Sequence, residues 1–184
     1  MNIRGRMVTL RAVEESDLAL LHKWANDPET QDTIGIIHFP SSMDFHKRWF
    51  EDLKNDQFNQ RLAIDAPSVG LVGLSSIFNI DWRNRHASHG IMIGNATNRG
   101  RGLGADAVMA TMRYAFDEMH LARLDGSSIE YNTNSQTVYA KLGWKEEGRR
   151  RNYYYRRGRY WDEVINGITK EDYDEFTKRT RYWG

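Results

Sequence analysis

A glycine-rich turn before a long amphipathic stretch is the first segment whose residues could do chemistry. It reads RGRGLG over residues 99–104, between an apolar strand-like run and a helix-like run. Glycines let backbone N–H groups approach a ligand closely, and a helix start offers unpaired donors and partial positive charge. The turn therefore suits a phosphate or pyrophosphate, although a tight turn with solvated arginines would use the same residues.

Two common phosphate-binding motifs do not fit this turn. A P-loop ends in Gly-Lys-Ser/Thr, and no such lysine follows the glycines. A dinucleotide fingerprint requires G-x-G-x-x-G, whereas Gly100-x-Gly102-x-Gly104 is one residue shorter. Asp125 follows the glycine turn by about the 20 residues expected of the acidic residue that binds the ribose. It lies early in its predicted strand, however, whereas that acidic residue lies at the end of the strand. Dinucleotide binding is therefore not favoured.

A second segment with possible catalytic chemistry reads NTNSQTVYAKLGW over residues 132–144. Asn132 comes at the end of a predicted strand, where its amide could hold a polar ligand. Tyr139 follows about two helical turns later, so it can face the same side of the helix. A phenol beside a thioester can protonate a departing thiolate. Asn132 could instead be a helix cap and Tyr139 a half-buried aromatic residue.

Together, the two segments resemble the signatures of the GCN5-related N-acetyltransferase (GNAT) superfamily. Arg99, Gly102 and Gly104 match its pyrophosphate-binding pattern (Arg/Gln)-x-x-Gly-x-(Gly/Ala). Residues 132–144 match the pattern N-x-x-(S/A)-x-x-x-Y-x-K-x-G-(F/W), in the expected order along the chain.

The resemblance extends over residues 7–168 and suggests a branch of the superfamily. VTLR at 8–11 and WANDP at 24–28 resemble the opening of the branch that contains ribosomal-protein alanine and spermidine acetyltransferases. EGR at 147–149 and GRYWD at 158–162 resemble the closing hairpin of the same branch. These segments indicate a branch and not a substrate.

The resemblance implies direct transfer of acetyl from acetyl-CoA to a primary amine of a small molecule or a protein N-terminus. It implies that the pyrophosphate lies on the amides of residues 99–104, that a strand edge polarises the thioester carbonyl, and that Tyr139 protonates the thiolate. No metal is expected. The expected cofactor-binding residues are Ile91, Met92, Ile93, Arg99, Gly100, Arg101, Gly102, Leu103, Gly104 and Asn132.

His89 is a departure from the branch pattern, which often has a glutamate two residues ahead of the Ile-x-Ile core before the glycine turn. An imidazole could serve as the general base there, because its ordinary pKa is about 6.5. It could equally be a surface residue at a strand end. Glu130 and a water chain are other candidates for the base.

Two charged segments are compatible with several acceptors and do not determine which one is used. Residues 149–159 hold six arginines and three tyrosines, which suits nucleic acid, a nucleotide amino sugar or an acceptor protein on a ribosome, or a solvated hairpin. Asp27, Glu29 and Asp32 could hold a polyamine or form a solvated loop. The net charge of +1 disfavours a dedicated nucleic-acid binder. An acyl-CoA-binding or RNA-binding module without turnover is the non-enzymatic alternative.

The elements that position these residues predict one α/β domain over residues 1–184. The order β-α-α-β-β-β-α-β-α-β-β predicts a mixed, mostly antiparallel sheet flanked by helices, with one β-α-β unit. Asn26-Asp27-Pro28 is expected to end the first helix and begin a loop. Ile91–Ile93 is apolar throughout and is expected to be buried on both faces. The expected strands are 7–12, 60–65, 69–80, 86–94, 121–129 and two within 144–168, and the expected helices are 16–26, one beginning near Ser41, one after the glycine turn, 133–142 and 170–180.

Composition limits the protein class. The chain has 184 residues and no cysteine, which excludes disulfides, thiolate nucleophiles and cysteine-ligated metals. No stretch approaches the roughly 20 apolar residues of a membrane-spanning helix. We therefore expect a cytoplasmic protein that acts without a membrane, with homodimer formation left open.

Overall fold

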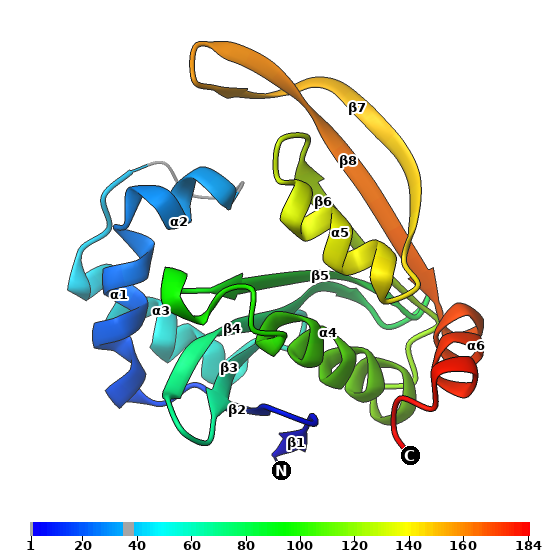
Figure 1. Cartoon of the computed structure of the whole chain (residues 1–184). Helices are drawn as coiled ribbons and strands as arrows, with labels where there is room; N and C mark the ends of the chain where they lie inside the picture. The colour runs from blue at the N-terminus through cyan, green and yellow to red at the C-terminus, as the bar shows by residue number, and fades with distance from the viewer. Residues whose placement is uncertain (1, 35–38) are drawn as a thin grey trace.

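One mixed sheet organises the protein. The structure, a computed structural model, describes residues 2–34 and 39–184. Within these residues, eight strands follow the order β1-β2-β3-β4-β5-β6-β8-β7 (Figure 1). Among the described strands, only β5 and β6 are parallel neighbours, which confirms the predicted α/β fold with a mostly antiparallel sheet. The strands are β1 Ile3–Arg4, β2 Thr9–Ala12, β3 Gln60–Ala66, β4 Gly70–Asp81, β5 His86–Ile93, β6 Arg123–Ile129, β7 Lys145–Arg156 and β8 Arg159–Thr169.

Helices cover both faces of this sheet. The helices are α1 Leu18–Ala25, α2 Pro28–Thr33, α3 Met43–Asp52, α4 Leu103–Arg113, α5 Thr133–Lys141 and α6 Lys170–Thr180. Leu18, Leu21 and Trp24 of α1 pack on β3 and β4 from one side. Apolar residues of α4, such as Met109 and Met112, fill the core on the other side together with α5 and α6. No helix in the described ranges is long and apolar enough to cross a membrane.

The segment after α1 differs from the prediction. Asn26 does end α1, but Pro28 is the first residue of a further helix, α2, and not the start of a loop. The Asp27 carboxylate accepts from the N–H of Thr30 at 2.8 Å, and a proline at the first helical position has no N–H to leave unpaired. The helix expected near Ser41 is α3, which Ser42 caps by accepting from the N–H of Phe45. Residues 35–38 of the predicted loop lie outside the described residues.

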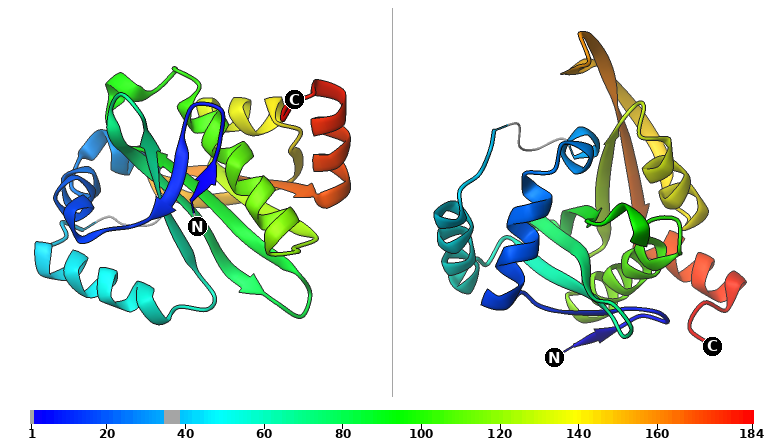
Figure 2. Two further views of the ribbon diagram at one scale, coloured as in Figure 1. Left: turned by 90° about the horizontal axis from the view of Figure 1, so that it is seen from below. Right: turned by 60° about the vertical axis from the view of Figure 1, so that its left-hand side comes forward.

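The sheet divides between β5 and β6. These two strands keep register only over His86–Ser88, opposite Arg123–Asp125. Beyond these pairs they diverge, and β6, β8 and β7 turn away from the plane of β2–β5 (Figures 1 and 2). The prediction that Ile91–Ile93 is buried on both faces is therefore wrong, because these residues lie past the last pair and are only half-buried.

Candidate active site

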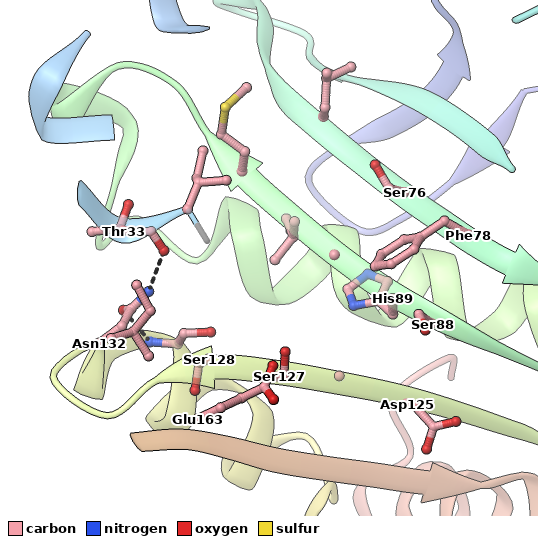
Figure 3. Close-up of a pocket in the computed structure, with 18 of the residues that line it drawn as sticks. Thr33, Ser76, Phe78, Ser88, His89, Asp125, Ser127, Ser128, Asn132 and Glu163 are labelled. Carbon is pink, nitrogen blue, oxygen red and sulfur yellow. Dashed lines mark hydrogen bonds between the residues drawn. The ribbon is translucent and has the colours of Figure 1, made fainter. Parts of the chain in front are cut away.

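A cavity of ≈ 920 Å³ opens where β5 and β6 diverge. Its walls come from α1, α2, α3, β3, β4, β5, β6, α5 and the β7–β8 hairpin. Figure 3 shows side chains of β4 and β5 on one side of this space and those of β6 and β8 on the other. Of the residues predicted from the sequence, the cavity lining includes His89, Ile91, Met92, Asn132 and Tyr139.

Side chains along β5 point alternately to the two faces of the sheet, and this determines which residues face an acceptor. Ser88 and Gly90 lie on the sheet face beneath α1 and α3, next to Phe78 and Ser76 of β4. His89 points to the opposite face, because successive strand residues alternate. There it packs beside Tyr139 and Trp144 and is only 3% exposed.

His89 belongs to a buried chain of hydrogen bonds. Its Nδ1 lies 2.9 Å from the hydroxyl of Tyr139, and its Nε2 lies 3.4 Å from Ser75 Oγ. Ser75 Oγ lies 2.7 Å from Thr111 Oγ1, which donates to the carbonyl oxygen of Ala107 at 2.8 Å. These hydrogen bonds thus link Tyr139, the predicted general acid, to the backbone of α4.

This terminal carbonyl fixes the direction of every bond in the chain. The hydroxyl of Thr111 donates its one hydrogen to the carbonyl of Ala107, so it must accept a hydrogen bond from the hydroxyl of Ser75. Because Ser75 then donates to Thr111, it must accept from Nε2–H of His89. A neutral imidazole then has a bare Nδ1, so the hydroxyl of Tyr139 donates to it. The resting proton of Tyr139 is therefore directed at His89.

The protonation states support this arrangement. Burial lowers the pKa of His89 to about 3, so the imidazole is neutral near pH 7 and binds a proton weakly. Burial also raises the pKa of Tyr139 well above its ordinary value, which keeps the phenol protonated. These observations favour His89 as the partner that holds Tyr139 rather than as the predicted general base, which stays untested.

The glycine turn lies at the far end of β5. Gly100 and Gly102 have φ values of 72° and 83°, in the left-handed region that favours glycine. Gly102 caps α4, whose first N–H groups have no partner within the helix. Leu103 is buried, so only its backbone N–H can meet a ligand. Gly104 packs near Ile93, with an added Cβ 3.5 Å from Ile93 Cγ1. This geometry can receive an anion.

The two arginines of the turn differ. The guanidinium of Arg99 donates to the carbonyls of Ile93 and Gly94, at 3.2 and 3.1 Å, and pairs with Glu29 at 2.6 Å. Arg99 therefore joins β5 to α2. Arg101 is exposed and remains the better placed counter-charge for a phosphate.

Comparison with known proteins identifies the family. Residues 7–145 match the acetyltransferase (GNAT) domain, a span that includes the glycine turn and the Tyr139 segment. The chain belongs to the GNAT acetyltransferase family. This membership confirms the predicted enzyme class, an N-acetyltransferase.

Two named relatives of this GNAT acetyltransferase are bacterial. The chain is 25% identical over 171 residues to YokL, an uncharacterized N-acetyltransferase of the SPbeta prophage in Bacillus subtilis strain 168, with 92% of this chain and 94% of that protein covered. It is 28% identical over 110 residues to the ribosomal protein uS5 alanine N-acetyltransferase of Escherichia coli K12, covering 59% of this chain and 56% of that protein.

A solved structure supports the GNAT fold. The spermidine N-acetyltransferase of Vibrio cholerae, in complex with CoA and spermine, matches with a TM-score of 0.85 and 23% identity. The match covers 91% of this chain and 98% of that one. The split sheet is therefore a feature of a known architecture.

Asn132 of this GNAT acetyltransferase serves as a helix cap. Its Oδ1 accepts from the N–H of Ser135 at 3.2 Å, and its Nδ2 donates to the carbonyl of Thr33 at 3.3 Å (Figure 3). The side chain also lines the cavity. The capping alternative is therefore present, and contact with the cofactor stays a prediction.

The acidic residues considered for a polyamine all have other partners. Asp27 accepts from Thr30, and Glu29 pairs with Arg99. Asp32 pairs with Arg157 of the hairpin and accepts a hydrogen bond from Tyr131. None of these three carboxylates belongs to the described cavity lining.

The candidate base Glu130 also lies outside the described lining of the cavity, near Arg149 at 3.9 Å. The cavity instead contains charged residues that the sequence analysis missed, among them Arg61 and Glu163. The available signal was an arginine directly before the apolar run of residues 62–64 in β3, but its neighbours depend on strand register. Sequence spacing alone does not give that register.

Proposed function

We propose that this GNAT acetyltransferase transfers the acetyl group of acetyl-CoA to a primary amine inside the β5–β6 cavity. The observation that carries the proposal is the divergence of β5 from β6, which leaves Ile91–Ile93 without a strand partner on the β6 side, beside the cavity. The left-handed glycines at the end of the same strand fit the pyrophosphate of the cofactor. When bound, acetyl-CoA supplies the acetyl group as a reactive thioester.

The free edge of β5 has a catalytic role in this proposal. Backbone N–H groups of Ile91–Ile93 donate to the thioester carbonyl and stabilise the negative charge that develops on its oxygen. Fixed backbone donors suit this role because they need no reorganisation during the reaction. The amides of residues 99–104 hold the pyrophosphate and set the position of the thioester along the strand.

Tyr139 is the proposed general acid. Its hydroxyl rests on His89 Nδ1 and must rotate away to protonate the thiolate. Breaking one hydrogen bond of this kind costs about 1 kcal/mol, which is small beside a reaction barrier. His89 then acts by fixing the position of the phenol ring and hydroxyl.

Water is the proposed route for the amine proton. The cavity face that an acceptor would approach carries the hydroxyls of Ser76 and Ser88, next to Gly90. The two carboxylates of the described lining, Asp125 and Glu163, are each already paired with an arginine. A water chain over the serine hydroxyls can carry the proton to solvent.

Release of free thiol from acetyl-CoA tests the proposal. Wild-type protein should release CoA only when an amine acceptor is present, and the acetylated amine should appear in equal amount by mass spectrometry. A protein that binds acetyl-CoA but releases no thiol with any amine would instead be an acyl-CoA-binding module. The cytoplasmic location and a homodimer stay predictions.

A further inference from the structure

Arg61 on β3 carries a charge that the fold does not neutralise. Its side chain lines the cavity, and its Nη1 is buried without a hydrogen-bond partner among the described residues. Burial lowers the pKa of this guanidinium, with only the distant charge of Asp56 opposing that effect. Asp56 itself accepts from the N–H groups of Phe58 and Asn59. A desolvated cation without a counter-ion is unfavourable for folding.

The other charged groups of the described cavity lining are balanced. Glu163 pairs with Arg150 at 2.8 Å and also accepts from the hydroxyl of Tyr154 at 3.1 Å. Asp125 pairs with Arg123, which lies outside the lining, at 2.6 Å. Arg61 therefore gives this cavity an uncompensated positive charge.

The strand register places Arg61 in line with Gly90 of β5. Arg61 is opposite Ser76, and Ser76 is opposite Gly90, so the three residues form one row across β3, β4 and β5. Neighbouring strands lie about 4.8 Å apart, which places the Cα of Arg61 roughly 10 Å from the Cα of Gly90. Gly90 has no side chain to block this row. The guanidinium carbon lies 5.4 Å from the ring centre of Phe78, which supports it within the cavity.

We propose that Arg61 binds an anionic group of the acetyl acceptor, and that the acceptor is a small primary amine carrying a carboxylate or a phosphate. This inference rests on the proposed function and specifies its substrate class. A guanidinium presents two parallel N–H donors that match either anion. The amine then points along the row toward β5, and the short distance limits the acceptor to a few bonds between nitrogen and anion.

The same charge disfavours a polyamine in this cavity. Spermidine carries several ammonium groups, which need carboxylates that are not already paired. Asp125 and Glu163 have arginine partners, and the acidic residues of α2 are engaged outside the cavity. A polyamine would therefore meet an unpaired cation instead of an anion.

Matched acceptors test this inference. We would measure CoA release with 4-aminobutyrate against its amide, 2-aminoethyl phosphate against ethanolamine, and spermidine. The variants are Arg61→Gln, Arg61→Lys and, as the matched control, Arg48→Gln on the exposed surface of α3, which lies outside the cavity lining. The carboxylate and phosphate pairs show which anion the site prefers.

We expect wild type to use an anionic amine with a KM at least tenfold below that of its neutral analogue. Arg61→Gln should raise the KM for the anionic amine roughly 10–100-fold, since charge-assisted hydrogen bonds are lost, and leave the neutral analogue unchanged. Arg61→Lys should fall between the two, and Arg48→Gln should match wild type. The melting temperature of Arg61→Gln should change little, because the guanidinium loses only its contact with the Phe78 ring and has no ion-pair partner among the described residues.

Several results would overturn the inference. These are equal use of anionic and neutral amines, a preference for spermidine, or an Arg61→Gln variant that is unchanged or equally impaired with every acceptor. If spermidine reacts and no anionic amine does, the inference fails while the proposed function stands. If acetyl-CoA itself does not bind by calorimetry, the proposed function fails as well.

Discussion

Replacing Tyr139 by phenylalanine separates the chemical role of its hydroxyl from its role in packing. The ring contacts with His89 and Trp144 remain, and only the proton donor is removed. Loss of a general acid lowers a rate by ~10²–10⁴-fold. We expect kcat to fall by this amount while the affinity for acetyl-CoA changes little, because the hydroxyl meets the sulfur mainly as charge develops there.

The same variant has a stability effect that follows from the hydrogen-bond chain. Without the phenol, Nδ1 of His89 is a buried acceptor with no donor, 3% exposed and lying 2.9 Å from the lost oxygen. An unsatisfied buried group of this kind costs about 1–3 kcal/mol. For a domain of this size, that free energy lowers the melting temperature by about 2–12 °C. Thermal melting followed by circular dichroism measures it.

Tyr173→Phe is the matched control for this experiment. Tyr173 is equally buried, on α6, and its hydroxyl accepts from Nε1–H of Trp183 at 2.8 Å. Its loss should lower the melting temperature similarly and leave kcat unchanged. A Tyr139→Phe variant with near-normal turnover would show that solvent protonates the thiolate and would refute the assignment. Equal loss of turnover and of coenzyme affinity would make Tyr139 a binding residue.

Three further predictions concern pH, the glycine turn and the tie between the chain ends. Because the folded pKa of His89 is about 3 and the unfolded value is about 6.5, the unfolded state binds more protons between these values. The free energy of unfolding of wild type should fall as pH drops from about 6.5 toward 3, by up to about 1.4 kcal/mol per pH unit from this residue. Denaturant titrations at several pH values should show that this free energy depends less steeply on pH in His89→Gln. Gly102→Ala should weaken CoA binding measured by calorimetry, whereas Gly158→Ala, at φ 75° in the distant hairpin turn, should lower only the melting temperature. Asp106→Ala should destabilise the protein by about 3 kcal/mol or more in denaturant titration, because the buried carboxylate accepts three backbone N–H bonds near the N-terminus and one hydroxyl bond from Tyr182; an unchanged midpoint would contradict this.

The sequence predicts the fold well where periodicity is strong and local. The helix expected at 170–180 has those bounds in the structure, and the glycine turn lies at the start of α4 as expected. Pro28 misled the prediction, because a proline at a helix start and a proline that ends a helix look alike in one sequence. Local sequence patterns therefore predict where a helix or strand lies, but they do not show whether a helix is followed by a loop or by a second short helix.

The site was harder to predict because it depends on which face each strand residue occupies. A shift of one position moves a side chain across the sheet, and this places His89 on the α4 face and Ser88 on the face beneath α1 and α3, although both residues line the cavity. The half-burial of Ile91–Ile93 follows from the loss of pairing with β6, which no local pattern encodes. The proposed role of Arg61 depends on the strand register that aligns it with Gly90.

Helix α2 connects the two halves of the divided sheet through charged side chains. Glu29 pairs with Arg99 beside β5, and Asp32 pairs with Arg157 in the β7–β8 hairpin on the other half. The partly exposed side chains of these pairs make them sensitive to ionic strength, since the screening length of dissolved salt falls from about 8 Å at 0.15 M to about 3 Å at 1 M. Raising the salt concentration should therefore weaken the connection of α2 to both halves of the sheet around the cavity, so that product dissociates faster while the buried contacts of Tyr139 remain unchanged.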